Sequence, residues 1–557
     1  MPTPAHLPCD EGVLRAGPAA DCAPAAGPWV LAATILGSSM AFIDGTAVNV
    51  ALPALQRDLG AAVSGVQWVV EAYALFLAGL LLVGGALGDR FGRRRIFLLG
   101  IGGFAAASAW CGLAPSLAQL VAARSVQGVA AALLVPGSLA LLSASFPPDR
   151  RGRAIGTWSG ATAITAAVGP LLGGWLVDHA SWRWVFFLNL PLAVAVLVLG
   201  WTRVPESRDS EAAQTLDGWG ALLATAGLGA LTFGLVEWPR LGPRDPRVAG
   251  TLAGGVLALA GFVWVEARRA APMMPLSLFR SKTFAGANLL TLFLYAALGG
   301  SLFFLPFDLI SVQGYSATAA GAALLPFILL MSILSRWAGG LVDRYGSRLP
   351  LVIGPAVAAL GFALFARAGV GGSYWTTFFP AVLVLGVGMT IAVAPLTTTV
   401  MGAVEVRHAG VASGINNAVS RVAGLLAVAV FGIVLVAVFN AGRERRLDDL
   451  RHLGLPTAAR AELDRSANRL AAAPIPASLP AEQKAAVRRA LDDAFVDGFR
   501  RTMLLSAGLA LLAALAAAGL IEGQRSRSSE ESGSETIRGS SEAGSSKRVT
   551  RRPKGAL

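Results

Sequence analysis

The chain alternates between long apolar stretches and short polar segments. Each apolar stretch holds about 20 residues, the length that a helix needs to cross the hydrocarbon core of a bilayer. Only helices and closed barrels can span a membrane, and long unbroken apolar runs favour helices. We therefore predict an all-α polytopic membrane protein with about fourteen transmembrane helices. They are expected near residues 29–50, 66–88, 96–113, 117–142, 154–177, 184–201, 217–238, 247–266, 284–306, 318–342, 349–367, 375–400, 410–437 and 500–521.

Three polar regions interrupt or flank this pattern. Residues 440–499, between the last two predicted spans, are rich in Arg, Asp, Glu and Ala with helix-like patterning, and they are too charged to enter the bilayer. Residues 1–28 are rich in Pro and Ala and lack the basic start and apolar core of a signal peptide. Residues 522–557 are rich in Ser, Glu and Arg, a composition that does not fold alone. We expect two disordered tails and one large loop outside the bilayer.

An internal repeat divides the chain into two related halves. Residues 85–94 read GALGDRFGRR and residues 339–348 read GGLVDRYGSR, with Gly, Leu, Asp, Arg, Gly and the last Arg at identical offsets. Two unrelated helix ends match this well only rarely, so a duplicated half is the better explanation. If each half has six helices, two spans remain as an insertion. The predicted units are a bundle over 29–201, a linker with two inserted spans over 202–283, and a second bundle over 284–521 that includes the loop 440–499.

Composition supports a membrane environment and excludes several functions. Of the 557 residues, 55% are apolar and 14% are charged, and the 65 glycines suit helices that pack closely in lipid. The net charge of +13 would suggest nucleic acid in a soluble protein, but the basic residues lie mostly in short loops, so no nucleic-acid partner is expected. The cysteines and histidines show no metal-ligand spacing, and no GxxxxGK[ST] loop for ATP is present. We therefore expect neither an enzyme nor a metal.

The distribution of Lys and Arg predicts the orientation. When the N-terminus is placed inside, the short loops on that side hold most of the basic residues, among them Arg93, Arg94, Arg95, Arg150 and Arg151. Basic residues in short loops stay in the cytoplasm, whereas a long segment such as 440–499 is translocated largely regardless of its charge. We predict a multi-pass protein of the cytoplasmic (inner) membrane, with both termini and both repeated loops in the cytoplasm.

The fifth predicted span carries a second motif, GTWSGATAITAAVGPLLGG. Its glycines are expected to leave one helix face nearly smooth, and Pro170 weakens the helix backbone, so a neighbour can pack closely and pivot. A static packing seam explains the face equally well. With the repeated loop, this span resembles the major facilitator superfamily, and within it the fourteen-span drug:proton antiporters. The resemblance covers residues 29–521 and implies the major facilitator fold, with two six-helix bundles plus two inserted helices.

The resemblance implies roles for both motifs. The repeated loop is similar to a latch of charge pairs that closes the cytoplasmic side, here Gly85, Asp89, Arg90, Gly92, Arg93, Arg94, Asp343, Arg344, Gly346 and Arg348, with support from Arg336. The fifth span is similar to the antiporter motif of exporters, here Gly156, Gly160, Gly169, Pro170, Gly173 and Gly174. Because Arg93 corresponds to Ser347, the copies have diverged, and we expect the first to form the stronger latch. Simple positive-inside anchoring is the alternative for these loops.

Charged residues inside spans are costly enough to indicate function. Asp44, Glu71 and Arg124 are each expected about 8–11 Å from the outer end of a span, in one layer of the first bundle. Burial favours the neutral form of a carboxyl and a nearby arginine favours the charged form, so this layer can serve as a proton relay. The patterns around Asp44 and Arg124 also resemble family motifs. A structural pair that only holds helices together is the alternative for Arg124, and a water-accessible position is the alternative for Glu71.

The remaining candidates belong to a predicted substrate cavity. Trp68 and Tyr73 flank Glu71, although aromatic residues near helix ends are more often interfacial anchors. Asn416 and Asn417, in GINNAVSRVAG, resemble a family-typical stretch, and a polar helix interface is the alternative. Asp308 is expected to be a solvated residue at the outer mouth.

These observations predict a secondary active transporter that exports small amphipathic drugs or antibiotics in exchange for protons. It is expected to work by alternating access, with no cofactor beyond the proton gradient. Its expected partners are the substrate, protons and membrane lipid, and we expect a monomer. A proton-coupled uptake symporter is the alternative within transport, and a non-transporting membrane receptor or scaffold is the alternative outside it.

Overall fold

The computed structural model describes residues 26–208, 217–269, 272–405, 408–450 and 454–523. In these ranges the chain is helical without strands, and fourteen helices are long and apolar enough to cross a membrane. The predicted fold class and number of spans are thereby confirmed. Nearly all of the two predicted tails lies outside the described residues.

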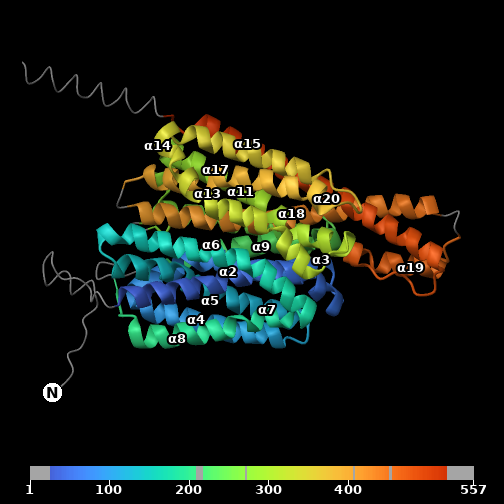
Figure 1. Ribbon diagram of the computed structural model, residues 1–557, viewed down its shortest axis with the longest axis horizontal. Coiled ribbons are helices and arrows are strands. Elements are labelled where there is room, and N and C mark those ends of the chain that lie inside the picture. The colour runs from blue at the N-terminus through green and yellow to red at the C-terminus, as the bar shows by residue number, and fades with distance from the viewer. Residues whose placement is uncertain (1–25, 209–216, 270–271, 406–407, 451–453, 524–557) are drawn as a thin grey trace, which may run out of the picture.

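The N-terminal half consists of the first six spans. They are α2 (Gly27–Asp58), α3 (Val63–Phe91), α4 (Arg93–Leu113), α5 (Leu117–Ser145), α6 (Pro148–His179) and the consecutive pair α7 (Arg183–Phe187) and α8 (Asn189–Arg203). Small residues hold this bundle together: a Cβ added at Gly84 of α3 would lie 1.9 Å from the carbonyl oxygen of Ala132 on α5. Close backbone approach of this kind is how helices associate in lipid. These helices form the lower layer, from blue to bluish green, in Figure 1.

The two inserted spans, α9 (Gly218–Leu241) and α10 (Pro246–Arg268), form a hairpin beside the junction of the two halves. Leu228 of α9 packs in one cluster with Leu75 of α3 and with Leu425 of the thirteenth span. Only 11% of the residues in the most apolar stretch of α10 are buried inside the protein. This helix therefore presents most of its surface to lipid. The insertion therefore covers the junction of the two halves from outside.

The C-terminal half holds the last six spans. Its elements are η1 (Leu276–Arg280), α11 (Lys282–Phe307), the π-helical turn η2 (Asp308–Val312), α12 (Ala317–Ala323), α13 (Leu325–Gly339), α14 (Leu341–Tyr345), α15 (Arg348–Phe365), α16 (Tyr374–Thr377), α17 (Phe379–Gly402), α18 (Ala409–Asp449) and α20 (Ala481–Leu520). The tenth span is divided into α12 and α13, with Pro326 in the first turn of α13. This half forms the upper layer in Figure 1.

The last two spans continue into the polar segment 440–499. Helices α18 and α20 hold 41 and 40 residues, so each is about 60 Å long, roughly twice the thickness of the hydrocarbon core. With α19 (Thr457–Arg465) and η5 (Ala467–Ala472), they build a lobe that projects at the right of Figure 1. We call this lobe the extension, its end of the molecule the extension end, and the opposite end, with the repeated loops, the loop end.

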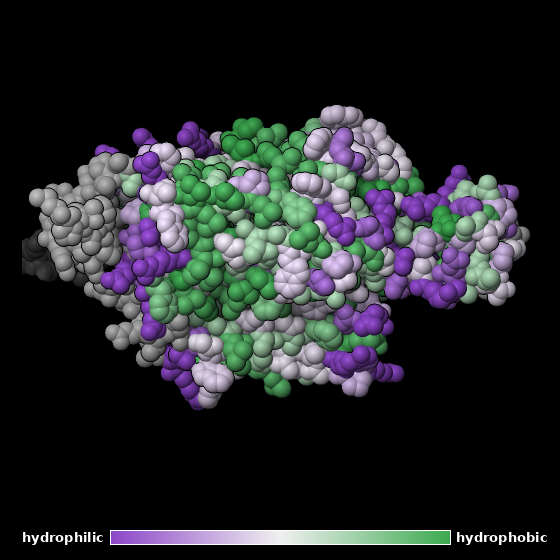
Figure 2. All heavy atoms as spheres, turned by 90° about the horizontal axis from the view of Figure 1, so that it is seen from below, coloured by the Kyte–Doolittle hydropathy of each residue, from purple (hydrophilic) through white to green (hydrophobic). Residues whose placement is uncertain are grey.

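The surface fits a lipid environment. In Figure 2 hydrophobic side chains cover the middle of the molecule and hydrophilic side chains gather at its two ends and on the extension. Large apolar residues are widely exposed, including Leu257 at 72% and Ile333 at 73%. Contiguous apolar surface of this extent is unfavourable in water, and lipid covers it at no cost.

Candidate functional site

A buried ion pair lies at the centre of the N-terminal half. Arg124 of α5 donates from Nη1 to Oδ2 of Asp44 on α2 at 2.5 Å, and the two side chains are 1% and 0% exposed. Gln127 and Asn189 donate their amides to the other carboxylate oxygen, Oδ1, at 2.9 and 3.3 Å. We call these four residues with Ser108, which accepts from Asn189 at 2.9 Å, the polar centre.

The guanidinium of Arg124 makes further contacts. Its Nε donates to the carbonyl oxygen of Val69 at 2.9 Å and Nη1 donates to Oε1 of Gln127 at 2.7 Å. The guanidinium carbon lies 4.3 Å from the centre of the Tyr73 ring, within reach of a cation–π interaction. A buried charge pair is tolerable only when it gains further hydrogen bonds, and here Nε and Nη1 of Arg124 and both carboxylate oxygens of Asp44 have partners. Protonation of Asp44 would remove the anion from this arrangement, and the positive charge of Arg124 would then have no counter-charge in the polar centre.

The sequence predicted Asp44 and Arg124 but not their neutral partners. Gln127 lies one turn after Arg124 on α5, a spacing that places both on one helix face. Asn189 is a polar residue in the apolar run FFLNLPL. These two features were available in the sequence, but a neutral amide in a span costs much less than a charge and so gives a weaker signal.

Glu71 is separate from this network. Its side chain is 1% exposed, and among the described residues neither carboxyl oxygen has a hydrogen-bond partner. It lies one turn before Leu75 on α3, so it faces the junction of α3, α9 and α18. Glu71 therefore does not take part in the network of Asp44 and Arg124, and the alternative of a water-accessible position is wrong for it. Neighbouring helices, including the inserted span α9, exclude water there.

The predicted cavity residues do not line one common cavity. Tyr73 is buried against Arg124, and Trp68 packs on the inserted helix, where its Nε1 donates to Oε1 of Glu237 at 3.3 Å. Asn416 donates to Oγ1 of Thr291 at 2.7 Å and to Oδ1 of Asn288 at 3.2 Å, which ties α18 to α11 within the C-terminal half. Asn417 is exposed and donates to the carbonyl of Ser413 on its own helix. The polar helix interface, rather than the cavity, describes Asn416.

The first copy of the repeated loop is organised around Gly92. Its φ of +112° is a conformation that favours glycine, and it lets α4 begin directly after α3 ends. Asp89 pairs with Nε of Arg93 at 2.8 Å. Glu206, which sequence reasoning missed, accepts from the backbone N–H groups of Arg94 and Arg95 at 2.9 and 3.2 Å and so caps α4. Gly85 lies against Pro136 of α5, and the Arg90 guanidinium lies over Phe91.

The second copy is less engaged. Gly346 repeats the positive φ, at +74°, while Asp343 and Arg344 are exposed. The expected support from Arg336 is absent, since no ion pair joins Arg336 to Asp343 in the described part of the chain. The helix is interrupted at Gly340, between α13 and α14, so residues seven apart no longer share one face. Arg348 instead donates to the carbonyl oxygen of Ala518 on the last helix.

The glycines of α6 lie on two faces, not on the single smooth face that was predicted. At about 100° per residue, Gly156, Gly160, Pro170 and Gly174 share one face, whereas Gly169 and Gly173 point elsewhere. The latter two pack on α2, where a Cβ at Gly173 would lie 2.7 Å from the Cβ of Ala47.

The first face changes its surroundings along the helix. Near the extension end it packs on α12: a Cβ at Gly174 would lie 2.3 Å from the carbonyl oxygen of Ala317, and one at Gly321 would lie 2.2 Å from that of Pro170. Toward the loop end, a Cβ at Gly156 or Gly160 would meet nothing within 4 Å. The contact between the halves, which we call the α6/α12 seam, is therefore tight at the extension end and gives way to open space toward the loop end.

An acidic residue closes this seam. Asp178, in the last turn of α6, accepts from the backbone N–H groups of Ala317 and Thr318 at 3.0 and 2.8 Å and from the Thr318 hydroxyl at 2.6 Å. A side chain of one half thus caps the first turn of a helix of the other half, where the helix dipole favours negative charge. The cap can form only while the halves touch at this end.

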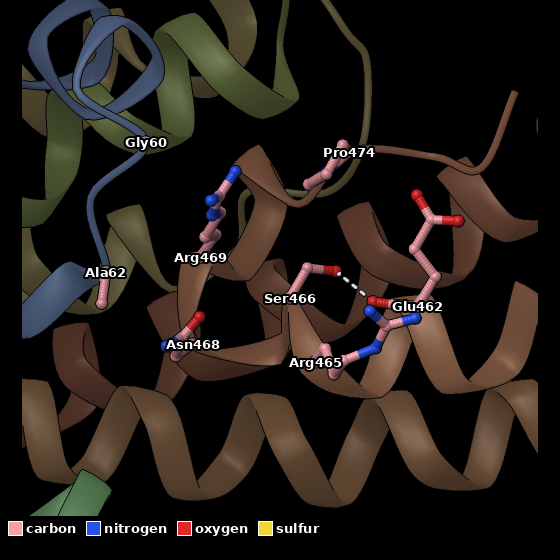
Figure 3. Close-up of a pocket in the computed structure, with 8 residues that line it drawn as sticks. All are labelled: Gly60, Ala62, Glu462, Arg465, Ser466, Asn468, Arg469 and Pro474. Carbon is pink, nitrogen blue, oxygen red and sulfur yellow. Dashed lines mark hydrogen bonds between the residues drawn. The ribbon is translucent and has the colours of Figure 1, made fainter.

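Two cavities lie at the extension end. The smaller, of about 260 Å³, separates the turn of Gly60 and Ala62 in the N-terminal half from Glu462, Arg465, Ser466, Asn468, Arg469 and Pro474 of the extension (Figure 3). Arg469 points toward Gly60 in this view, and its carbonyl oxygen accepts from Gln56 of α2 at 3.3 Å. The larger, of about 510 Å³, lies between Arg57 of α2, residues 310–314 and the extension. Among the described residues, no group of three or more His, Cys, Asp or Glu is placed to hold a metal ion.

Comparisons with known proteins agree with this geometry. The model of the family described as "Major Facilitator Superfamily" matches residues 34–428. The chain is 36% identical over 499 residues to the tetracenomycin C resistance and export protein of Streptomyces glaucescens, covering 88% of this chain and 91% of that protein. It is 37% identical over 410 residues to a puromycin resistance protein of Streptomyces alboniger, covering 73% and 81%.

Solved structures show the same fold at low identity. A bacterial homologue of the human lysosomal transporter Spinster, in an inward-facing and unoccupied conformation, superposes with a TM-score of 0.60 at 18% identity, covering 89% of this chain and 98% of that one.

Proposed function

This chain belongs to the major facilitator superfamily and transports small molecules across a membrane, and on that premise we propose that it exports drugs or antibiotics in exchange for protons. The observation that carries the proposal is the fully buried pair of Asp44 and Arg124. Ionisable residues inside a membrane bundle are expensive and are retained at ion and proton pathways. Relatives that are resistance and export proteins support the direction and the class of substrate.

Asp44 is the proposed proton carrier. Proton transfer to its carboxylate cancels its charge and weakens its hold on Arg124, whose other partners on α3 and α5 remain. When the guanidinium of Arg124 moves back to the carboxyl group of Asp44, its positive charge favours release of the proton. Glu71 is a second candidate: an unpartnered charge is costly in its surroundings, so it is expected to be neutral in this conformation and to exchange its proton when α3, α9 and α18 separate.

Alternating access follows from the α6/α12 seam. The cap from Asp178 and the backbone contacts at Gly174 and Gly321 hold the halves together at the extension end, and open space beside Gly156 and Gly160 gives the substrate a route from the loop end. Opposite rocking of the halves would open the extension end. The repeated loops, with Asp89 and Arg93 as the stronger copy, would then close the loop end.

The orientation completes the proposal. The basic residues in the short loops support an orientation with the loop end in the cytoplasm and the extension outside. The proposed protein is a monomer in the inner membrane. The conformation described here is then inward-facing. An amphipathic substrate would enter beside α6, from the cytoplasm or from the inner leaflet.

Everted membrane vesicles with an acidified lumen test the proposal. Ethidium and puromycin are added in turn, and lumenal pH is followed with a fluorescent amine. Antiport alkalinises the lumen on addition of a substrate, whereas symport acidifies it. Asp44→Asn should abolish the response, and Asp58→Asn, a matched change of an exposed acid on the same helix, should retain it. An unaltered response in Asp44→Asn would contradict the assignment of the coupling residue.

A further inference from the structure

A second buried acid, Asp308, lies at the extension end of the C-terminal half. The sequence predicts a solvated residue here, but the side chain of Asp308 is 0% exposed. Gln313 donates to its Oδ2 at 3.3 Å, and its Oδ1 has no partner among the described residues. The acid is therefore half-satisfied in a place that water does not reach directly.

The backbone at Asp308 departs from the regular helix. Residues Asp308–Val312 form a π-helical turn that directly follows α11. Such turns are rare and occur often at functional sites, because they reposition side chains and loosen the backbone hydrogen-bond ladder. Gln313 links the turn to the loop between α15 and α16, since it also donates to the carbonyl of Gly369 at 2.7 Å and accepts from Gly371 N–H at 2.9 Å.

The larger cavity adjoins this turn. Its wall includes Ile310, Ser311, Val312 and Gly314 together with Asp492 of α20. Its volume of about 510 Å³ has room for on the order of ten water molecules. Asp492 is 7% exposed and its Oδ1 also lacks a partner among the described residues. The cavity thus brings water to within one helical turn of Asp308.

Most other charged groups near Asp308 have an ion-pair or hydrogen-bond partner. Asp492 pairs through Oδ2 with Arg488 at 3.1 Å, and Arg488 also donates to the carbonyls of Ala471 and Ser311. Arg500 donates to the carbonyl of Ala368 at 2.7 Å and lies 3.9 Å from Asp497.

After these pairings, Asp308 has no ion-pair partner among the described residues, and its Oδ1 has no hydrogen bond there. A single carboxyl of this kind suits a proton better than a metal ion.

The exposure of Asp308 to water should depend on the conformation of the transporter. Arg57 of the N-terminal half lines the same cavity as the π-helical turn of the C-terminal half. A separation of the halves at this end would widen the cavity and admit water to Asp308. The same carboxyl would therefore be closed off in the present conformation and open in the other.

We propose that Asp308 is a second proton-binding site, loaded with a proton from the extension side through this cavity. The carboxylate takes one proton from water when the extension end opens and holds it as a carboxylic acid when the end closes. This inference rests on the proposed proton coupling. It adds a site in the C-terminal half and predicts that external pH acts there.

The first test needs no substrate. Infrared difference spectra of the purified protein between high and low pH should show the band of a buried carboxylic acid. That band should be lost in Asp308→Asn, shifted in Asp308→Glu and retained in Asp58→Asn. If Asp308→Asn keeps every carboxylic-acid band of the unmodified protein, the proposal is wrong. A band that depends on sodium rather than on pH would also overturn it.

The second test uses proteoliposomes with fixed pH on the loop side and varied pH on the extension side, and ethidium as the probe. The dependence of transport on external pH should flatten severalfold in Asp308→Asn and return in Asp308→Glu, which also covers the case in which the asparagine variant does not insert. If the dependence on external pH is unchanged in Asp308→Asn while Asp44→Asn still uncouples transport, the second proton site is rejected and the proposed function is kept. Absence of any pH response in the unmodified protein would reject the proposed function as well.

Discussion

The two halves of this transporter bury different polar networks. The N-terminal half holds a charged pair in its core, Asp44 and Arg124, and it sends a charged side chain, Asp178, across the α6/α12 seam. The C-terminal half holds a neutral network of Asn416, Asn288 and Thr291. At the seam, its backbone N–H groups donate to Asp178. The proposed coupling pair therefore lies in the N-terminal half, whereas the contact between the halves is made by hydrogen bonds from backbone N–H groups to a carboxylate.

Removing the core charge should have the largest effect. In Asp44→Asn the amide keeps a hydrogen bond to Arg124 but cannot carry a proton, so proton-driven export is expected to fall to the background of empty vesicles. The measurement is uptake of ethidium into everted vesicles, normalised to the amount of protein in the membrane. If Asn416→Ser lost as much transport as Asp44→Asn, the contrast between the halves would be wrong.

Adding one methyl group at the seam should come next. Gly174→Ala would place a Cβ 2.3 Å from a backbone carbonyl of the other half, and overpacking of this kind costs about 1–3 kcal/mol. The closed form of the extension end should lose population, seen as faster labelling of a cysteine placed at Thr318. Gly160→Ala lies on the same face of the same helix in open space and should change little. Equal labelling in the two variants would show that the seam does not gate this end.

Removal of the charged cap should have a smaller effect of the same sign. Asp178→Ala loses three hydrogen bonds, but the site is exposed, so we expect a shift toward the open form of up to about tenfold, or ~1.4 kcal/mol. Asp178→Asn, which keeps an acceptor, should fall between. Double electron–electron resonance between labels on α6 and α12 would measure the two populations. Identical distance distributions in all three proteins would remove Asp178 from the gating mechanism.

The smallest effect is expected in the neutral network. Asn416→Ala removes the donor to Thr291, and interhelical hydrogen bonds in membrane proteins contribute about 0.6 kcal/mol on average. The melting temperature in detergent should drop by a few degrees while the rate of export stays close to normal. Loss of export without loss of stability would instead return Asn416 to the substrate pathway.

The sequence was sufficient for the fold because each span is a local property of the chain. Twenty apolar residues predict a helix wherever they occur, and the repeated loop revealed the duplication without any tertiary information. The two charges of the polar centre could also be predicted, since a charge within an apolar run stands out.

Contacts between distant segments could not be predicted in the same way. Asp178 lies at the end of a span, where an acid is common, and its partners are 139 and 140 residues away. Glu71 was placed correctly along α3, but its burial comes from helices that are distant in the sequence, and α9 packs on Leu75, one turn away. The split of the α6 glycines between two faces follows from helix geometry, whereas which face meets α12 depends on the packing of the halves.

The unbroken passage of α18 and α20 into the extension makes the extension a lever arm. Rigid helices cannot turn inside the membrane without carrying their outer ends with them. A rotation of about 15°, a size known from other allosteric proteins, would displace a point about 30 Å beyond the pivot by about 8 Å. Small rearrangements in lipid should therefore become large displacements in water, where a label on the extension can report them without touching the transport pathway.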